Sequence, residues 1–437
     1  MNQTNVKGLA LYVVGLSIVW PALVRAEDLL IAPDRETGIY DAGETAGWTF
    51  RWEGEAPPPS PRYEIKQGGL TVLDAGQLQF SNDAARVAFT LSTPGAVRIE
   101  TTWQDGEDEH EVIGGMVASP DDIGLSSPEP ADFDAFWDAK LVALADVPVN
   151  AAVDWHDDDS ADWRYGVITM DHVNGSKIHG QLALPKTEGP FPAMLIVQWA
   201  GVYGLEPAWV TDRAAEGWLV LNINAHDLPI DRPPSFYQGQ AEGTLKNYWS
   251  IGNDNRETSY YLRMYLSCYR AADYLANHPA WDGKTLVVMG GSQGGQQALV
   301  TAGLHPDVTA ALAIVPAGCD MLGPAVGRRG GWPQWYSNTD GNNEAAVHEA
   351  SRYFDVANFA PRITCPVLIG IGLLDQTCPP EGILAAVNQV RSPKVVVLLP
   401  RGAHQEEDGS HRTYYERCYG EWLPTLREGR PLDIAEK

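Results

Sequence analysis

A serine stands among glycines where an apolar run gives way to a segment with helical character. The segment from Leu286 to Val300 reads LVVMGGSQGGQQALV and contains the pattern G-x-S-x-G, centred on Ser292. In this pattern the serine occupies a sharp turn between a strand and a helix, and the glycines let chain segments pass closely. Such a turn exposes the Ser292 hydroxyl as a nucleophile and directs the Gln293 N–H toward the oxyanion that forms when the hydroxyl attacks a carbonyl. Glycine-rich turns also bind phosphate, but this spacing fits neither the dinucleotide fingerprint nor the P-loop.

A serine hydroxyl needs a base that takes its proton, and the base needs an acid that orients it. On a strand–turn–helix scaffold the order along the chain is serine, acid and histidine, each after a strand. Asp375 follows the apolar run PVLIGIG, and His404 follows the run KVVVLLP. The sequence therefore predicts that Ser292, Asp375 and His404 form a catalytic triad.

Other residues compete for two of these roles, and a second oxyanion donor is also required. Asp320 follows the apolar run ALAIVPAG and is an alternative acid. His226 follows an earlier run and His411 lies in a polar segment, so neither occupies the loop in which the base is expected. The turn after PAMLIVQWA reads Ala200-Gly201-Val202, where glycine lets the backbone point an N–H inward. We therefore predict Val202 N–H as the second donor, with an ordinary strand-ending turn as the alternative.

Aromatic and basic side chains in loops are candidate substrate contacts. Indole faces stack well on the apolar faces of sugars, although packing beneath long loops explains such residues equally well. Arg328-Arg329 stands out in an acidic chain, either as a contact for an anionic sugar or as part of a solvated loop. The aromatic candidates are Trp199, Trp249, Trp332 and Trp335.

Composition excludes several classes of protein. The chain has 437 residues, and its 57 acidic against 31 basic side chains give a formal net charge of −26. Its length predicts two domains, and a surface this negative repels nucleic acid and anionic lipid headgroups, so we expect neither as a partner. Five cysteines do not indicate a disulfide-stapled scaffold. Cys365 and Cys378 flank a predicted strand, which places them too far apart for a disulfide, and they match no zinc motif. No metal or other cofactor is predicted.

The N-terminus is typical of a signal peptide. Lys7 precedes the apolar stretch Leu9–Trp20, which is too short for a comfortable membrane span, and Val24-Arg25-Ala26 offers a cleavage site. Residues 1–26 are therefore predicted to be removed, with an uncleaved anchor as the alternative. We expect an exported protein, periplasmic or secreted, that does not stay at the membrane after cleavage.

Two regions of different patterning follow. Residues 27–118 contain short alternating runs broken by glycine and proline, which predict a small immunoglobulin-like β-sandwich. Residues 119–130 contain prolines and serines and are predicted to be a linker. In residues 131–437, six apolar runs alternate with helical segments such as Thr258–His278, a pattern that predicts a mostly parallel sheet flanked by helices. Residues from about 320 to 350 break this rhythm and are predicted to be an insertion above the sheet.

Four stretches resemble the acetyl xylan esterase and cephalosporin-C deacetylase family of α/β-hydrolases. They are DFDAFWDAKL, VVMGGSQGG, LLDQTCPP and GAHQE, and the resemblance runs from about residue 131 to the C-terminus. It implies an α/β-hydrolase that removes acetyl and other small acyl groups from sugars or comparable alcohols. It also implies Ser292, Asp375 and His404 as the triad and Gln293 as an oxyanion donor. The family hints at homo-oligomers, which the additional N-terminal domain could block.

The chain departs from the family pattern at three places. Ala200-Gly201-Val202 stands where the family has His-Gly-Tyr, and the stretch NAHDLPIDRPP lacks the family's Arg-Gly-Gln. The usual His-Glu pair is His404-Gln405. These departures imply a divergent branch, in which the chemistry transfers better than the substrate.

We therefore expect an exported serine esterase that deacetylates polysaccharide or oligosaccharide through an acyl-enzyme, with acetylated carbohydrate as its partner. One alternative is a serine peptidase or lactone hydrolase of the same fold, although such peptidases usually carry a large gating domain. Another is a catalytically idle carbohydrate-binding protein, against which the complete triad argues.

Overall fold

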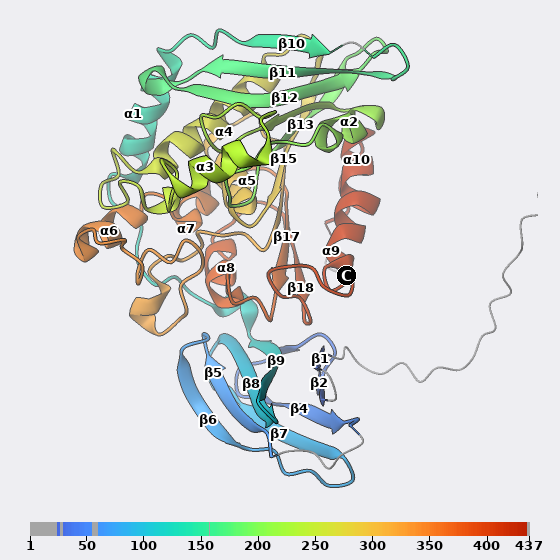
Figure 1. The fold of residues 1–437 in the computed structure, drawn as a ribbon, viewed down its shortest axis with the longest axis vertical. Helices are drawn as coiled ribbons and strands as arrows, with labels where there is room; N and C mark the ends of the chain where they lie inside the picture. The colour runs from blue at the N-terminus through green and yellow to red at the C-terminus, as the bar shows by residue number, and fades with distance from the viewer. Residues whose placement is uncertain (1–23, 27–28, 55–59, 157, 435–437) are drawn as a thin grey trace, which may run out of the picture.

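A computed structural model describes residues 24–26, 29–54, 60–156 and 158–434 of the chain (Figure 1). Most of the predicted signal peptide lies outside these residues. Its last three residues form strand β1 (Val24–Ala26), which pairs antiparallel with β2 (Leu29–Pro33) at the edge of a sheet. Cleavage after Ala26 would therefore remove this edge strand.

The N-terminal domain consists of two sheets packed face to face. Trp48 and Phe50 from one sheet and Ile99 and Met116 from the other belong to a single buried cluster. Alternation along each strand turns one face inward and leaves the other for solvent, which gives the predicted β-sandwich. In spatial order, the first sheet contains β1, β2, β4 (Thr45–Trp52) and β7 (Ala84–Thr90), and the second contains β3 (Ile39–Tyr40), β9 (Asp108–Ala118), β8 (Gly95–Asp105), β5 (Arg62–Gln67) and β6 (Thr71–Gln77).

The catalytic domain is built on a nine-stranded sheet. All six predicted apolar runs form strands of this sheet, and they pair with one another in parallel. Three further strands, which pair antiparallel, extend the sheet at one edge and were not predicted. In spatial order the strands are β10 (Ala152–His156), β11 (Trp163–Asp171), β12 (Lys177–Pro185), β14 (Leu219–Ile223), β13 (Phe191–Ile196), β15 (Trp281–Gly291), β16 (Ala310–Ile314), β17 (Val367–Gly372) and β18 (Lys394–Leu399).

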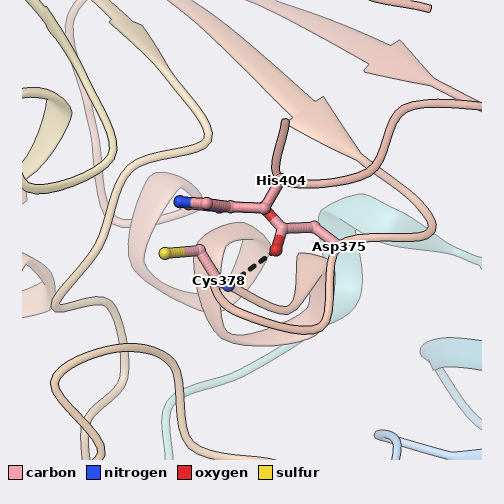
Figure 2. A group of neighbouring side chains, drawn as sticks. All are labelled: Asp375, Cys378 and His404. Carbon is pink, nitrogen blue, oxygen red and sulfur yellow. Dashed lines mark hydrogen bonds and ion pairs between the residues drawn. The ribbon is translucent and has the colours of Figure 1, made fainter. Parts of the chain in front are cut away.

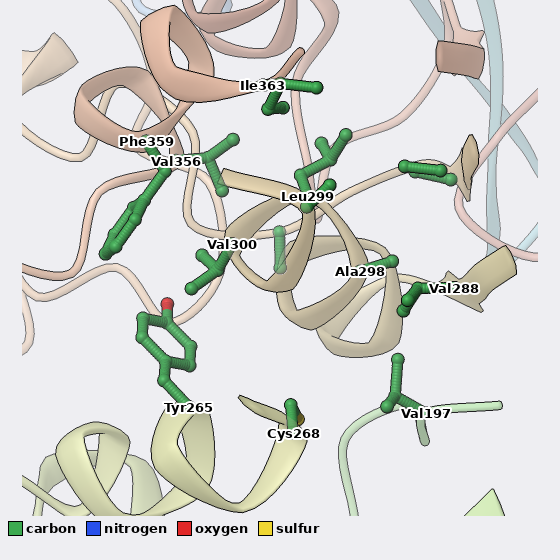
Figure 3. Close-up of a cluster of buried hydrophobic side chains, with 14 of the residues drawn as sticks. Val197, Tyr265, Cys268, Val288, Ala298, Leu299, Val300, Val356, Phe359 and Ile363 are labelled. Carbon is green, nitrogen blue, oxygen red and sulfur yellow. The ribbon is translucent and has the colours of Figure 1, made fainter. Parts of the chain in front are cut away.

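Helices cover both faces of this sheet, as an α/β-hydrolase fold requires (Figure 1). Successive residues of β15 point to opposite faces, so Val288 belongs to one buried cluster and Val287 to the other. Figure 3 shows α5 packed within the first cluster, with Leu299 and Val300 among its buried side chains. The helices are α1 (Phe133–Ala145), α2 (Ala208–Ala215), α3 (Pro234–Glu242), α4 (Tyr260–Ala276), α5 (Gln293–Leu304), α6 (Glu344–Ser351), α7 (Val356–Phe359), α8 (Pro380–Val387), α9 (Arg412–Tyr415) and α10 (Leu423–Arg427), with a π-helical turn (Glu416–Trp422) between the last two.

The predicted insertion contacts the N-terminal domain. Arg329 N–H donates to the Gly68 carbonyl at 2.6 Å, in the turn between β5 and β6. The Arg328 side chain is only 15% exposed and forms ion pairs with Asp320 and Glu381. Arg328 is therefore neither free for an anionic sugar nor part of a solvated loop, and both sequence-based interpretations of it were wrong.

The segment between the domains is also anchored. The Ser126 N–H and hydroxyl both donate to Asp320 Oδ1, at 2.8 and 2.6 Å, and Ile123 is buried. Within the part of the chain that the structure describes, no helix is both long and apolar enough to cross a membrane.

Candidate active site

The turn that carries Ser292 has the strained geometry expected of a nucleophile. Ser292 lies between the end of β15 and the start of α5 with φ 56° and ψ −122°, a positive φ that serine rarely adopts. A Cβ on Gly290 would lie 2.6 Å from the Gly294 carbonyl carbon, and one on Gly294 would lie 2.5 Å from the Val197 carbonyl oxygen. Both glycines of the G-x-S-x-G pattern are therefore required, because backbone atoms block any larger residue.

Of the three residues predicted as a triad, His404 lies within hydrogen-bond distance of both Ser292 and Asp375. His404 Nε2 is 3.0 Å from Ser292 Oγ, and His404 Nδ1 is 2.8 Å from Asp375 Oδ2. The other carboxylate oxygen of Asp375 accepts the Thr377 and Cys378 N–H groups at 2.8 and 2.7 Å; Figure 2 shows the second of these bonds. The Asp375 side chain is fully buried, whereas that of His404 is 14% exposed.

These contacts favour one tautomer of the neutral imidazole. A carboxylate that already accepts two N–H groups is an acceptor, so His404 Nδ1 carries the proton that it shares with Asp375. His404 Nε2 is then left without a proton and faces the Ser292 hydroxyl as an acceptor. The arrangement can take the hydroxyl proton and stabilise the resulting imidazolium.

Both predicted oxyanion donors lie on turns next to this site. Gln293 is the first residue of α5, so its N–H has no acceptor within the helix. Among the described residues the Val202 N–H has no hydrogen-bond partner, whereas the neighbouring Gly201 N–H donates to the Tyr248 hydroxyl at 3.2 Å. A Cβ on Gly294 would lie 2.5 Å from the Val197 carbonyl oxygen, so the start of α5 passes closely by the segment that leads into the second turn.

The aromatic candidates separate into exposed and buried residues. Trp335 is 1% exposed and its indole N–H donates to the Trp249 carbonyl at 2.8 Å, so the prediction that it contacts substrate was wrong. Trp249 and Trp332 are half-buried and pack together with ring centroids 5.9 Å apart. Trp199 is 49% exposed and stacks on Tyr203, and it offers the most accessible indole face of the four.

The competing acid and bases have other partners. Asp320 accepts hydrogen bonds from Ser126 and Arg328 at the junction of the two domains. His411 Nε2 donates to the carbonyl of Ala403, beside the loop of the predicted base. His226 is 1% exposed and donates to a carbonyl of the predicted oxyanion turn. None of the three therefore replaces Asp375 or His404.

Sequence reasoning missed two residues near this site. The Tyr248 hydroxyl lies between the two oxyanion turns, and Tyr248 begins a short 3₁₀ helix (Tyr248–Ser250) that no motif marks. Cys378 lies beside Asp375 and His404, and donor atoms of these three side chains fall within 4.8 Å of one another (Figure 2). A metal ion on these atoms would compete with the hydrogen bonds of His404. Burial also raises the pKa of the Cys378 thiol, which disfavours the thiolate that binds metals. The donor set therefore fits a proton relay better than a metal centre.

Comparison with known proteins identifies the family of the chain. Residues 124–419 match the acetyl xylan esterase family (AXE1). Acetyl esterase Axe7A of Xylanibacter ruminicola is 34% identical over 384 residues, which cover 86% of this chain and 86% of that protein. This match covers more of the chain than the catalytic domain does, so it extends into the N-terminal domain.

Solved structures of acetyl xylan esterases are similar to this chain over a length close to that of its catalytic domain. Acetyl xylan esterase from Paenibacillus sp. R4 is 26% identical with a TM-score of 0.58, and the match covers 69% of this chain and 98% of that one. Acetyl xylan esterase 1 from Thermoanaerobacterium sp. shares the fold at 23% identity, with a TM-score of 0.58 and 68% and 96% coverage. The chain therefore belongs to the acetyl xylan esterase family and is a carboxylic ester hydrolase with an α/β-hydrolase fold.

Proposed function

We propose that the protein is an exported serine esterase that removes acetyl groups from carbohydrate through an acyl-enzyme. One observation carries the proposal: hydrogen bonds link Ser292 to His404 and His404 to Asp375, at a strand-to-helix turn with a positive φ. Membership of the acetyl xylan esterase family supports acetylated carbohydrate as the substrate class.

In the proposed reaction Ser292 Oγ attacks the ester carbonyl while His404 Nε2 takes the hydroxyl proton. The Gln293 and Val202 N–H groups bind the negative oxygen of the tetrahedral intermediate. His404 then gives its proton to the sugar oxygen as the bond between that oxygen and the acetyl carbon breaks, and acetyl-Ser292 remains. In the second half, His404 takes a proton from water, the hydroxide attacks the acetyl carbonyl, and acetate leaves as Ser292 regains its proton.

The experiment compares acetate release by the mature chain with that of Ser292→Ala. The substrates are p-nitrophenyl esters of increasing acyl length and acetylated xylan oligomers. We expect activity that favours acetyl and falls at least about 10³-fold in the variant. Ser351→Ala is the control, because Ser351 is buried and donates only to a helix carbonyl in α6. Equal activity of wild type and Ser292→Ala, or cleavage of peptides in place of esters, would contradict the proposal.

Export rests on the N-terminal sequence, in which Lys7 is followed by an apolar stretch and a small-residue cleavage site. Expression of the full-length chain followed by fractionation and N-terminal sequencing tests it directly. We expect a mature protein that begins at Glu27 and is found outside the cytoplasm. An intact N-terminus in a membrane fraction would support the uncleaved anchor instead.

A further inference from the structure

We infer that Tyr248, held by His226, positions the oxyanion hole by joining its two turns. The inference rests on the proposed function, because it assigns the Gln293 and Val202 N–H groups to that hole. Tyr248 itself is 1% exposed and does not reach the substrate, so it is a positioning residue.

The phenol of Tyr248 makes one hydrogen bond to each side of the predicted hole. It donates to Gln293 Oε1 at 2.6 Å, at the start of α5. It accepts the Gly201 N–H at 3.2 Å, in the turn that precedes Val202. Gln293 Nε2 has no partner among the described residues. Within that part of the chain, Tyr248 is therefore the only hydrogen-bond partner of the buried Gln293 side-chain amide. One hydroxyl therefore fixes the spacing between the two turns.

His226 holds the same turn from the other side. Its Nε2 is 2.8 Å from the Gly201 carbonyl oxygen, and its Nδ1 is 2.7 Å from the Tyr260 hydroxyl. A carbonyl only accepts, so Nε2 carries the proton and Nδ1 accepts from Tyr260. The imidazole also packs edge-to-face against the Tyr248 ring, with centroids 4.6 Å apart.

The imidazole keeps this tautomer at neutral pH. His226 is 1% exposed, and burial lowers its pKa to about 4. Both backbone polar groups of Gly201 are thus hydrogen-bonded: its N–H to Tyr248 and its carbonyl to His226. Because the Val202 N–H belongs to the same peptide unit as the Gly201 carbonyl, His226 fixes the direction in which that N–H points.

Removal of the Tyr248 hydroxyl tests the inference. Tyr248→Phe keeps the ring and frees Gln293 and Gly201. With p-nitrophenyl acetate we expect kcat/KM to fall about 10- to 100-fold, while KM changes less than twofold. This decrease is no larger than the decrease in rate that follows removal of an oxyanion donor itself. The inhibition constant of phenylboronic acid, which forms a tetrahedral adduct on an active-site serine, should rise by a similar factor. A purely structural role would lower the melting temperature and leave that constant unchanged.

Two further variants make the result specific. Tyr261→Phe is the matched control, because Tyr261 is fully buried and its hydroxyl has no partner among the described residues; it should keep wild-type kinetics. His226→Gln retains a side-chain donor for the Gly201 carbonyl and should be more active than His226→Ala.

The outcomes separate this inference from the proposed function. If Ser292→Ala is inactive but Tyr248→Phe has wild-type kcat and inhibitor affinity, the positioning role is overturned and the esterase mechanism stands. If Ser292→Ala remains active, the proposed mechanism itself fails. Equal effects of Tyr248→Phe and Tyr261→Phe would also overturn the inference.

Discussion

Arg328 Nε lies 3.0 Å from Glu381 Oε1, and this nearly buried ion pair joins the insertion to helix α8 where the two domains meet. The other Glu381 oxygen accepts the N–H of Ala96, in strand β8 of the N-terminal domain, at 3.0 Å. Arg328 also donates to Asp320 Oδ2 at 2.7 Å. The N-terminal domain is therefore connected to the catalytic domain through a network of buried charges.

The same loop reaches the candidate active site. Trp332 N–H donates to the Thr377 carbonyl at 2.7 Å, two residues after Asp375. The N-terminal domain contacts this loop at Arg329, and the same loop contacts the turn that carries Asp375. We therefore expect the β-sandwich to support the geometry of the site. Its position beneath the ends of β17 and β18 is visible in Figure 1.

The first prediction concerns Arg328. Arg328→Met keeps much of the side-chain volume but leaves Asp320 and Glu381 buried without their cation. Removal of one partner from a buried ion pair costs about 3–5 kcal/mol, because the remaining charge is uncompensated. We expect a loss of that order in the free energy of unfolding, measured with urea, together with a lower kcat. In the control, Arg412→Met removes an ion pair whose side chains are 78% and 60% exposed, and it should leave stability unchanged. A stable and fully active Arg328→Met would show that the network does not support the site.

The second prediction concerns acid stability and His172. This side chain is 1% exposed, and burial lowers its pKa to about 3, with smaller contributions from Arg263 and Arg270. The unfolded chain takes up a proton on this imidazole near pH 6.5, whereas the folded chain does not. The stability that the neutral form contributes is therefore complete above pH 6.5 and is lost as the pH falls toward 3.

We expect His172→Gln to lose less stability than wild type between pH 7.5 and 5, by about 2 kcal/mol. Urea unfolding at both pH values measures this difference and does not depend on any constant cost of the substitution. His156→Gln is the control, because His156 is exposed in strand β10 and should leave the pH dependence unchanged. Parallel pH dependence of wild type and His172→Gln would show that His172 does not remain neutral in the fold.

The parts of the structure that could be predicted are those that depend on local sequence patterns. The six parallel strands read as continuous apolar runs, and β13, β16 and β17 are buried along almost their whole length. The relative positions of Ser292, Asp375 and His404 follow from chain order, because parallel strands bring their carboxyl ends to one edge. Strand β10 alternates half-buried and exposed residues, so it has no such run and was missed.

Features set by tertiary contact could not be predicted. Trp335 and Trp199 are the same residue type in loops, yet only the fold shows which one is covered. The role of Arg328 depends on two carboxylates: Asp320 lies eight residues before it, but Glu381 belongs to helix α8, much farther along the chain. Tyr248 belongs to no pattern at all, and its importance becomes visible only when both oxyanion turns are placed around its hydroxyl.

The third prediction separates an exposed tryptophan from a buried one. Trp199→Ala removes an accessible indole face, so KM for acetylated xylan oligomers should rise several-fold while KM for p-nitrophenyl acetate stays the same. Trp335→Ala should instead lower the free energy of unfolding by about 3–5 kcal/mol, because it leaves a cavity under the loops. Tyr419→Ala, at a 43% exposed aromatic on the C-terminal helical segment, is the control for nonspecific effects on oligomer binding. An unchanged KM for oligomers in Trp199→Ala would remove this residue from the binding surface.

The last prediction concerns the close approach of two elements at the serine turn. A methyl group on Gly294 would lie 2.5 Å from the Val197 carbonyl oxygen and 3.2 Å from the Gln198 carbonyl carbon. Neither backbone atom can rotate away, so Gly294→Ala must push α5 from the end of β13 and shift Ser292 relative to His404. We expect at least a 100-fold loss of kcat/KM and a lower melting temperature, measured with p-nitrophenyl acetate and by thermal unfolding.

Gly239→Ala is the matched control, because Gly239 lies in α3 with nothing within 4 Å of the added Cβ. That control should gain up to about 1 kcal/mol in stability from helix propensity and keep full activity. Wild-type kinetics in Gly294→Ala would mean that the turn tolerates displacement and that its tight packing does not position the nucleophile.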